Sequence, residues 1–152
     1  MKKTMISLKL QHGVMLLEAL ISILIFSIGI LAIVALQANS IKLATDSKYR
    51  ADANLLANRL IGEMWLAHTD AGFTTAFSTG GASYVAWASD VASTLPTTGV
   101  SAPTVTITQA SILAASTVSS TVDIDIWWSV PGGTPGNSGA HRYNTRAQIT
   151  NN

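Results

Sequence analysis

The hydrophobic positions of the chain begin with one long apolar segment. Residues 14–36 are apolar apart from four positions: Glu18, Ser22, Ser27 and Gly29. A segment of this length can cross a bilayer, which takes about 20 residues in a helix. The sequence therefore predicts a single membrane-spanning helix close to the N-terminus.

The residues before this segment indicate how it is oriented. The first 13 residues are polar and basic, with lysines at Lys2, Lys3 and Lys9. Because basic residues flanking a span stay in the cytoplasm, everything after Leu36 is expected on the far side of the membrane. A secretory signal peptide fits less well, since its apolar core is about 7 to 15 residues and ends in an A-x-A-like site. A simple signal anchor remains an alternative.

The pattern beyond the span is that of an amphipathic helix. Residues 37–67 contain no proline, and apolar residues recur at steps of three and four: Ala53, Leu56, Leu60, Met64 and Ala67. Such spacing places them on one helix face. Arg59 and Glu63 lie four residues apart beside this stripe and can pair. We expect one helix of about 50 residues whose first half is apolar all round.

The next stretch is expected to be a loop followed by a short helix. Residues 73–81 are rich in Thr, Ser and Gly, which predicts a loop. A helix is expected over residues 84–95, with an apolar face of Tyr84, Trp87, Val91 and Leu95, and Pro96 ends it.

The period then changes to two, which is typical of strands. Alternation begins at Val105 and Ile107, returns over residues 122–128, and appears a third time over residues 142–149. A Pro- and Gly-rich connection at residues 131–139 makes the last two strands a predicted hairpin. The fold class is therefore α+β, with a long N-terminal helix, half membrane-spanning and half amphipathic, packed on a small antiparallel sheet.

Composition narrows the functional classes. The 152 residues carry a formal net charge of +1, and without the three N-terminal lysines six basic residues face eight acidic ones. No basic patch remains for contacts with phosphates, so nucleic acid is not indicated as a partner. The chain has no cysteine, which excludes disulfides and thiolate metal sites.

Catalytic and metal-binding motifs are missing from the sequence. His12, His68 and His141 are dispersed, and no zinc-protease, serine-hydrolase or nucleotide-binding motif occurs. We therefore expect no enzyme and no cofactor. Asp123 and Asp125 share a strand face, where solvent exposure is favoured over a calcium site because calcium takes six or more oxygens.

Two further features concern surfaces. Trp127 and Trp128 point to opposite sides of a regular strand, with Trp128 expected in the core. Adhesion through the Ser/Thr/Gly-rich stretches at residues 73–81 and 131–139 is an open alternative to their being plain connectors.

Glu18 is the most informative single residue. An acid at the centre of a membrane span costs about 2.5 to 3.5 kcal/mol on insertion scales. A positive partner would reduce this cost, and cleavage between Gly13 and Val14 would create one, the α-amino group of Val14. We expect this amino group to pair with Glu18 of a neighbouring subunit. The alternative is a carboxylate that reaches water at the membrane interface.

The stretch Gly13-Val14-Met15-Leu16-Leu17-Glu18-Ala19-Leu20 resembles the class III signal of type IV prepilins and type II secretion pseudopilins. In that family Gly precedes the cut and Glu follows within the apolar segment. The resemblance implies cleavage between Gly13 and Val14 by a prepilin peptidase and N-methylation at Val14. It also implies packing of the N-terminal helix against those of other major and minor pilins.

The likeness extends to minor pilins of the PilV type, which take part in pilus assembly or modification. It rests on residues 28–31, 35–37 and 55–64, and more loosely on Trp87 and Trp128. Val14 and Met15 replace the common Phe and Thr of the family. The absence of a C-terminal cysteine pair and of an interior helix proline favours a minor over a major pilin.

The expected organisation is a leader at 1–13, a long helix at 14–67 with its span at 14–36, and an extracytoplasmic α+β head at 68–152. The expected location is the inner membrane, crossed once, and then a pilus filament or its tip. A minor pseudopilin of a type II secretion system and a signal-anchored binding domain stay open as alternatives.

Overall fold

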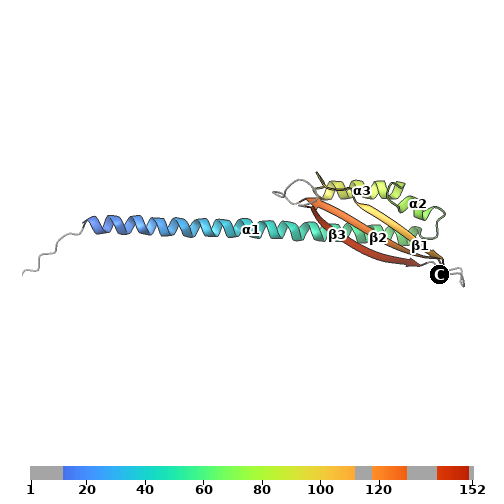
Figure 1. The fold of residues 1–152 in the computed structure, drawn as a ribbon, viewed down its shortest axis with the longest axis horizontal. Coiled ribbons are helices and arrows are strands. Elements are labelled where there is room, and N and C mark those ends of the chain that lie inside the picture. The colour runs from blue at the N-terminus through green and yellow to red at the C-terminus, as the bar shows by residue number, and fades with distance from the viewer. Residues whose placement is uncertain (1–11, 112–117, 130–139, 151–152) are drawn as a thin grey trace, which may run out of the picture. The chain divides into compact units, whose positions relative to one another are not determined.

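The computed structural model describes residues 12–111, 118–129 and 140–150 (Figure 1). The elements in chain order are α1 (His12–Ala67), α2 (Phe73–Phe77), α3 (Ala82–Thr94), β1 (Thr104–Ser111), β2 (Val118–Ser129) and β3 (Ala140–Thr150). The chain divides into an N-terminal unit, Met1–Ala44, and a C-terminal unit, Thr45–Asn152. The prediction of a long helix that begins apolar, together with a small antiparallel sheet, is confirmed. The connection at residues 131–139 lies outside the described residues.

The part of α1 in the C-terminal unit buries the predicted stripe. Ala53, Leu60 and Met64 are completely buried, and Leu56 is 7% exposed. Ala57, which the periodicity did not single out, is also completely buried. Since successive turns of an α-helix present positions i, i+3, i+4 and i+7 on one side, these side chains form a continuous apolar face. This face supplies α1's share of the core.

The three strands form one antiparallel sheet in the order β1-β2-β3. Val105 pairs with Ile124 between β1 and β2, and Ile124 pairs with Thr145 between β2 and β3. The predicted hairpin of the last two strands is therefore confirmed. The buried side chains of the sheet alternate along β2, as the period of two predicts: Val122, Ile124, Ile126 and Trp128.

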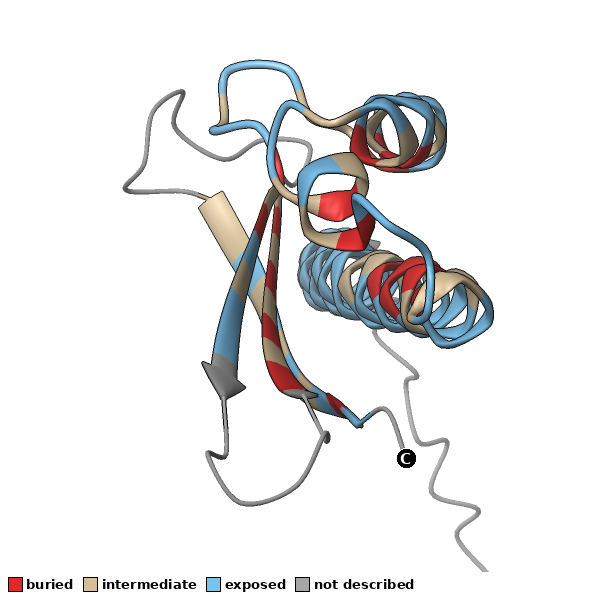
Figure 2. Ribbon diagram, turned by 90° about the vertical axis from the view of Figure 1, so that its right-hand side faces the viewer, coloured by how far each residue is buried: buried red, intermediate tan, exposed pale blue. Residues whose placement is uncertain are grey.

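The helices of the C-terminal unit lie on one side of the sheet, with their buried faces turned toward it (Figure 2). The predicted second helix is confirmed as α3, with Tyr84, Trp87 and Val91 buried. The Trp87 indole Nε1 donates a hydrogen bond to the Leu56 carbonyl oxygen at 3.0 Å, joining α3 to α1. The core of the unit is thus a helix layer packed on a sheet.

The prediction of a loop over residues 73–81 is wrong for its first part, which forms α2. Phe73 and Phe77 lie one turn apart and are 6% and 5% exposed. Their rings contact each other, with centroids 5.4 Å apart. Burial of this aromatic pair outweighs the low helix propensity of the threonines between them. The turn after α2 requires glycine at Gly81, where a Cβ would overlap backbone carbonyl oxygens.

The edge of β1 that faces away from β2 is hydrogen-bonded to another segment at one position, Val105. The Thr79 backbone N–H donates to the Val105 carbonyl oxygen at 3.1 Å, and the Val105 N–H donates to the Thr79 hydroxyl at 2.8 Å. Thr79 therefore satisfies both backbone groups of Val105 on that side. The segment between α2 and α3 is held against the sheet by this contact.

Arg59 on α1 makes two ion pairs, one within α1 and one that joins α1 to α3. Its Nε lies 3.0 Å from Glu63 Oε1, as the i,i+4 spacing predicts, and its Nη1 lies 2.8 Å from Asp90 Oδ2. All three side chains are well exposed, and exposed ion pairs contribute little. We expect Arg59→Ala to lower the free energy of unfolding by less than about 1 kcal/mol, with the difference shrinking at high salt. Urea unfolding at two salt concentrations checks this; a loss of several kcal/mol would contradict it.

Candidate functional site

The residues predicted at the processing junction lie at the beginning of the described chain. Gly13 is in the first turn of α1, and the Val14 side chain is 57% exposed. The lysines of the predicted leader lie outside the described residues. The junction is therefore followed directly by helix.

The N-terminal unit exposes its apolar side chains on all sides of α1. From Val14 to Leu43 the large apolar side chains are between 45% and 72% exposed. The helix is long and apolar enough to cross a membrane, and no part of its most apolar stretch is buried within the protein. The Ser27 hydroxyl donates to the Ile23 carbonyl oxygen at 2.7 Å, so this polar group is satisfied inside the helix.

Glu18 lies on the same face of α1 as Val14, one turn further on. Val14, Leu17, Glu18, Ile21 and Ser22 together line a shallow hollow on the helix surface. Glu18 is exposed, and within the described residues it has no ion-pair partner. The next charged residue along α1 is Lys42. The structure thus brings the two predicted residues to one face and leaves the carboxylate available.

The outer face of the sheet carries paired charges. Asp123 Oδ1 lies 2.7 Å from Arg146 Nε, and Asp125 Oδ1 lies 2.6 Å from Arg142 Nη2. The hydrogen bond to Asp123 raises the pKa of the Arg146 guanidinium. Arg142 also lies over the Trp127 ring, 5.7 Å from its centroid. The two carboxylates share a face, as predicted, and each is paired with an arginine through its Oδ1 oxygen.

No group of three or more His, Asp or Glu side chains suited to holding a metal occurs in the part of the chain that the structure describes. His68 Nδ1 lies 2.6 Å from the Trp65 carbonyl oxygen, and His141 is engaged elsewhere in the C-terminal unit. His68 and His141 are therefore not brought together in the C-terminal unit.

One titratable contact was not predicted from the sequence. His141 Nδ1 lies 3.0 Å from Asp46 Oδ1, and the His141 ring stacks on Trp128 with centroids 5.8 Å apart. Trp128 and His141 are paired across β2 and β3, whereas Asp46 belongs to α1. Trp128 is completely buried, which confirms its predicted place in the core. Only the pairing of strands and helix reveals this cluster, because the three residues are far apart in the sequence.

Tyr84 and Trp87 place polar groups in the core, and backbone oxygens satisfy both. The Tyr84 hydroxyl donates to the Pro103 carbonyl oxygen at 2.6 Å. Burial raises the pKa of Tyr84, because the ionised phenolate would lose its hydration there. This group acts as a structural donor.

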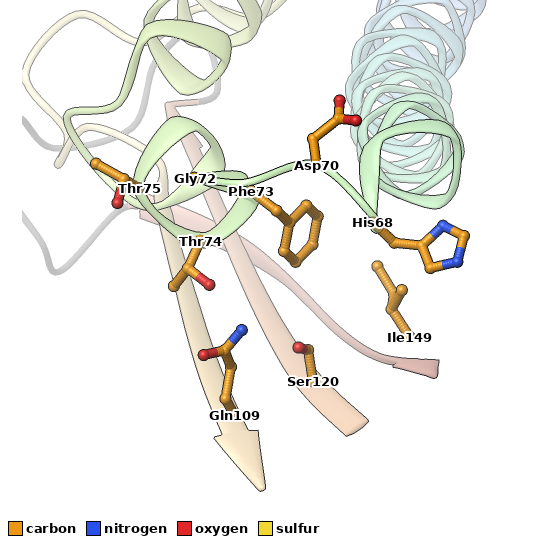
Figure 3. A pocket seen from close by; sticks show the side chains of 9 residues that line it. All are labelled: His68, Asp70, Gly72, Phe73, Thr74, Thr75, Gln109, Ser120 and Ile149. Carbon is orange, nitrogen blue, oxygen red and sulfur yellow. The ribbon is translucent and has the colours of Figure 1, made fainter. Parts of the chain in front are cut away.

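The C-terminal unit also contains a pocket of about 360 Å³ between α2, the end of α1 and the sheet (Figure 3). Its polar residues include Gln109 and Ser120, neither of which the sequence analysis singled out. The sequence does carry a signal for them, because Gln109 and Ser120 are polar residues at positions where the alternation of β1 and β2 predicts apolar ones.

Comparison with known proteins finds no match to a family model, a curated protein or a solved structure. The functional argument therefore rests on the residues themselves. Val14 and Glu18, the residues predicted to take part in processing and subunit pairing, lie on a common face of α1.

Proposed function

We propose that this chain is the precursor of a minor type IV pilin, a structural subunit that takes part in pilus assembly or modification. A prepilin peptidase would cut it between Gly13 and Val14 and the new N-terminus would be methylated. The observation that carries the proposal is Glu18, the single acid in the apolar and exposed segment 14–36 of α1, one turn from Val14.

The exposed apolar side chains of α1 need a non-aqueous environment. Contiguous apolar surface of this extent is not stable in water and marks a membrane or protein contact. The inner membrane provides such an environment before assembly, and the helices of other pilins provide it afterwards. One surface thus serves both states, because lipid tails and packed side chains are similarly apolar.

Glu18 is a charged group on this apolar surface and needs a positively charged partner in lipid. A plain membrane anchor has no such need. In lipid the carboxylate is costly, and a free α-amino group at Val14 would offset that cost. Within one subunit the two groups lie one turn apart, and between staggered subunits the same pairing joins neighbours. Pairing between subunits would then favour the filament over the membrane-dispersed state.

The C-terminal unit would form the outer part of the subunit. Its α+β layout, with the amphipathic end of α1 against a sheet, is the layout expected of a pilin head. It would lie outside the cytoplasm and then on the filament surface or tip.

The first test is N-terminal mass spectrometry of the full chain expressed with and without a prepilin peptidase. We expect a peptidase-dependent start at Val14 carrying an N-methyl group. Gly13→Leu should abolish the cut. Gly29→Leu is the matched control, since a Cβ at Gly29 meets no atom within 4 Å and the position lies away from the junction.

The alternatives give different results. A start at Met1 in the presence of the peptidase would mean a signal-anchored binding domain, and a cut beyond Leu36 would mean a secreted one. A minor pseudopilin of a type II secretion system would give the same cleavage. It is distinguished by neighbouring genes of a secretion system and by loss of secretion, with pili intact, when the gene is deleted.

A further inference from the structure

The pocket between α2, the end of α1 and the sheet has the dimensions of a small-molecule site. Its volume of about 360 Å³ falls within the range of about 300 to 1,000 Å³ typical of ligand pockets. It is formed by residues of a single unit, and the proposed assembly through α1 makes no use of it.

The floor of the pocket is a row of three residues that are neighbours across the sheet. Gln109 on β1 pairs with Ser120 on β2, and Ser120 pairs with Ile149 on β3. The next row on this face of the sheet is apolar throughout: Ile107, Val122 and Ala147. The inner face of the sheet therefore turns polar where the pocket begins.

Ser120 presents a hydroxyl at the pocket. The residue is 5% exposed, and its hydroxyl makes no hydrogen bond within the described residues. Ser119 is buried to a similar extent, at 6%, yet its hydroxyl accepts a hydrogen bond from Gln148 Nε2 at 2.7 Å. The Ser120 hydroxyl can therefore donate and accept hydrogen bonds with a ligand group.

The polar groups turned into the pocket are neutral. Figure 3 shows the Gln109 amide, the Thr74 hydroxyl and the Ser120 hydroxyl around the space beneath the Phe73 ring. An amide both donates and accepts hydrogen bonds, as does a hydroxyl, so these groups match hydroxyls of a ligand. The edge of Phe73 and the Ile149 side chain add apolar wall suited to C–H groups.

The two ionisable residues that line the pocket are Asp70 and His68. The Asp70 carboxylate and the His68 ring point away from the Phe73 ring in Figure 3. His68 Nδ1 is also occupied by the Trp65 carbonyl oxygen. Among the described residues that line the pocket there is no lysine or arginine, so an anionic ligand would meet no permanent cation there.

We propose that this pocket binds a neutral monosaccharide, either free or as the terminal residue of a longer glycan. Sugars combine hydroxyls that both donate and accept with apolar C–H faces, and this is the combination that the pocket offers. The binding would be weak, since the ligand is held by a few uncharged hydrogen bonds. The proposal does not depend on filament assembly.

The test is to titrate sugars into the full chain and to detect their binding by saturation-transfer NMR. The detergent that holds the chain in solution has no sugar head group. The probes are glucose, galactose, mannose and N-acetylglucosamine, with glucuronic acid as an anionic comparison. We expect at least one neutral sugar to bind. Gln109→Ala and Ser120→Ala should each weaken binding about tenfold, because each removes a hydrogen-bonding group.

Thr108→Ala is the matched control. Thr108 neighbours Gln109 on β1 and is exposed, but its side chain projects to the other face of the sheet. The Thr108→Ala variant should bind sugar with the same affinity as the unaltered chain. Because Gln109 is itself exposed, its variant is expected to fold normally, which near-ultraviolet circular dichroism verifies.

Three results would overturn the proposal. They are no binding of any neutral sugar, binding of glucuronic acid alone, and binding unchanged in both Gln109→Ala and Ser120→Ala. Repeating the titration with an oligosaccharide that ends in the bound sugar identifies the source. Tighter binding of the oligosaccharide supports a terminal glycan residue, whereas equal binding supports the free sugar.

Discussion

Replacing Glu18 by glutamine is expected to leave membrane insertion and cleavage intact while reducing incorporation into filaments by about tenfold or more. The substitution keeps the size of the side chain and removes its charge. Insertion should become easier, because a neutral amide costs less in lipid than a carboxylate, whose cost at the centre of a span is about 2.5 to 3.5 kcal/mol. Assembly should suffer, because the proposed pairing with the α-amino group of Val14 is lost. Each tenfold change corresponds to about 1.4 kcal/mol.

The measurement compares the amounts of the chain in sheared filaments and in the membrane fraction. Ser22→Ala is the matched control, since Ser22 lines the same hollow on α1 and carries no charge. Glu18→Asp keeps the charge on a shorter side chain and should retain part of the incorporation. Normal incorporation of Glu18→Gln would refute the pairing. Failure of cleavage in the same variant would instead assign Glu18 to recognition by the peptidase.

Trp128→Ala is expected to be the most destabilising single change in the C-terminal unit, costing about 3 to 5 kcal/mol of unfolding free energy. The side chain is completely buried among the core residues and stacks on His141. Its removal leaves a cavity that the surrounding sheet and helices can fill only in part. Since many domains are stable by only about 5 to 15 kcal/mol, this loss is a large fraction of the total.

Trp127→Ala provides the comparison, because Trp127 is the next residue of β2 and faces the other side of the sheet. Its main contact is the Arg142 guanidinium, worth about 0.5 to 1 kcal/mol at an exposed position. Urea unfolding of the full chain in detergent, followed by near-ultraviolet circular dichroism, measures both variants. Trp128→Phe serves if the alanine variant does not fold. Equal losses for Trp127→Ala and Trp128→Ala would contradict the assignment of their faces.

The elements with a clear period were predicted well from the sequence. The stripe from Ala53 to Met64 and the alternation from Val122 to Trp128 depend on which side of a helix or strand is buried. That property is local, so the order of residues reveals it. The hairpin of β2 and β3 followed from the turn residues between two such strands.

The features that depend on packing between distant segments were missed. α2 forms because Phe73 and Phe77 are buried in the core, although the residues next to them in the sequence favour a turn. The contact of Asp46 with His141 depends on how α1 packs against β3, and the pairing of Gln109 with Ser120 depends on the strand register. The pocket lies at such a junction, so no window of the sequence contains it.

The candidate processing site depends on molecules other than this chain. Gly13, Val14 and Glu18 were chosen from their order in the chain and from a resemblance. Their places on α1 agree with the pairing that we propose, but cleavage and pairing involve a second protein or a second subunit. These predictions therefore await the experiments on Val14 and Glu18.

The hydrogen bonds between Thr79 and Val105 have a consequence for aggregation. An open sheet exposes unpaired backbone groups along its outer strands, and these can recruit strands from other molecules. On β1, Thr79 already takes both groups of Val105, which interrupts the row that an incoming strand would need. On β3, Arg142 and Arg146 place charge along the opposite edge, a feature that discourages such pairing. Molecules that come close together are thereby hindered from joining their sheets edge to edge.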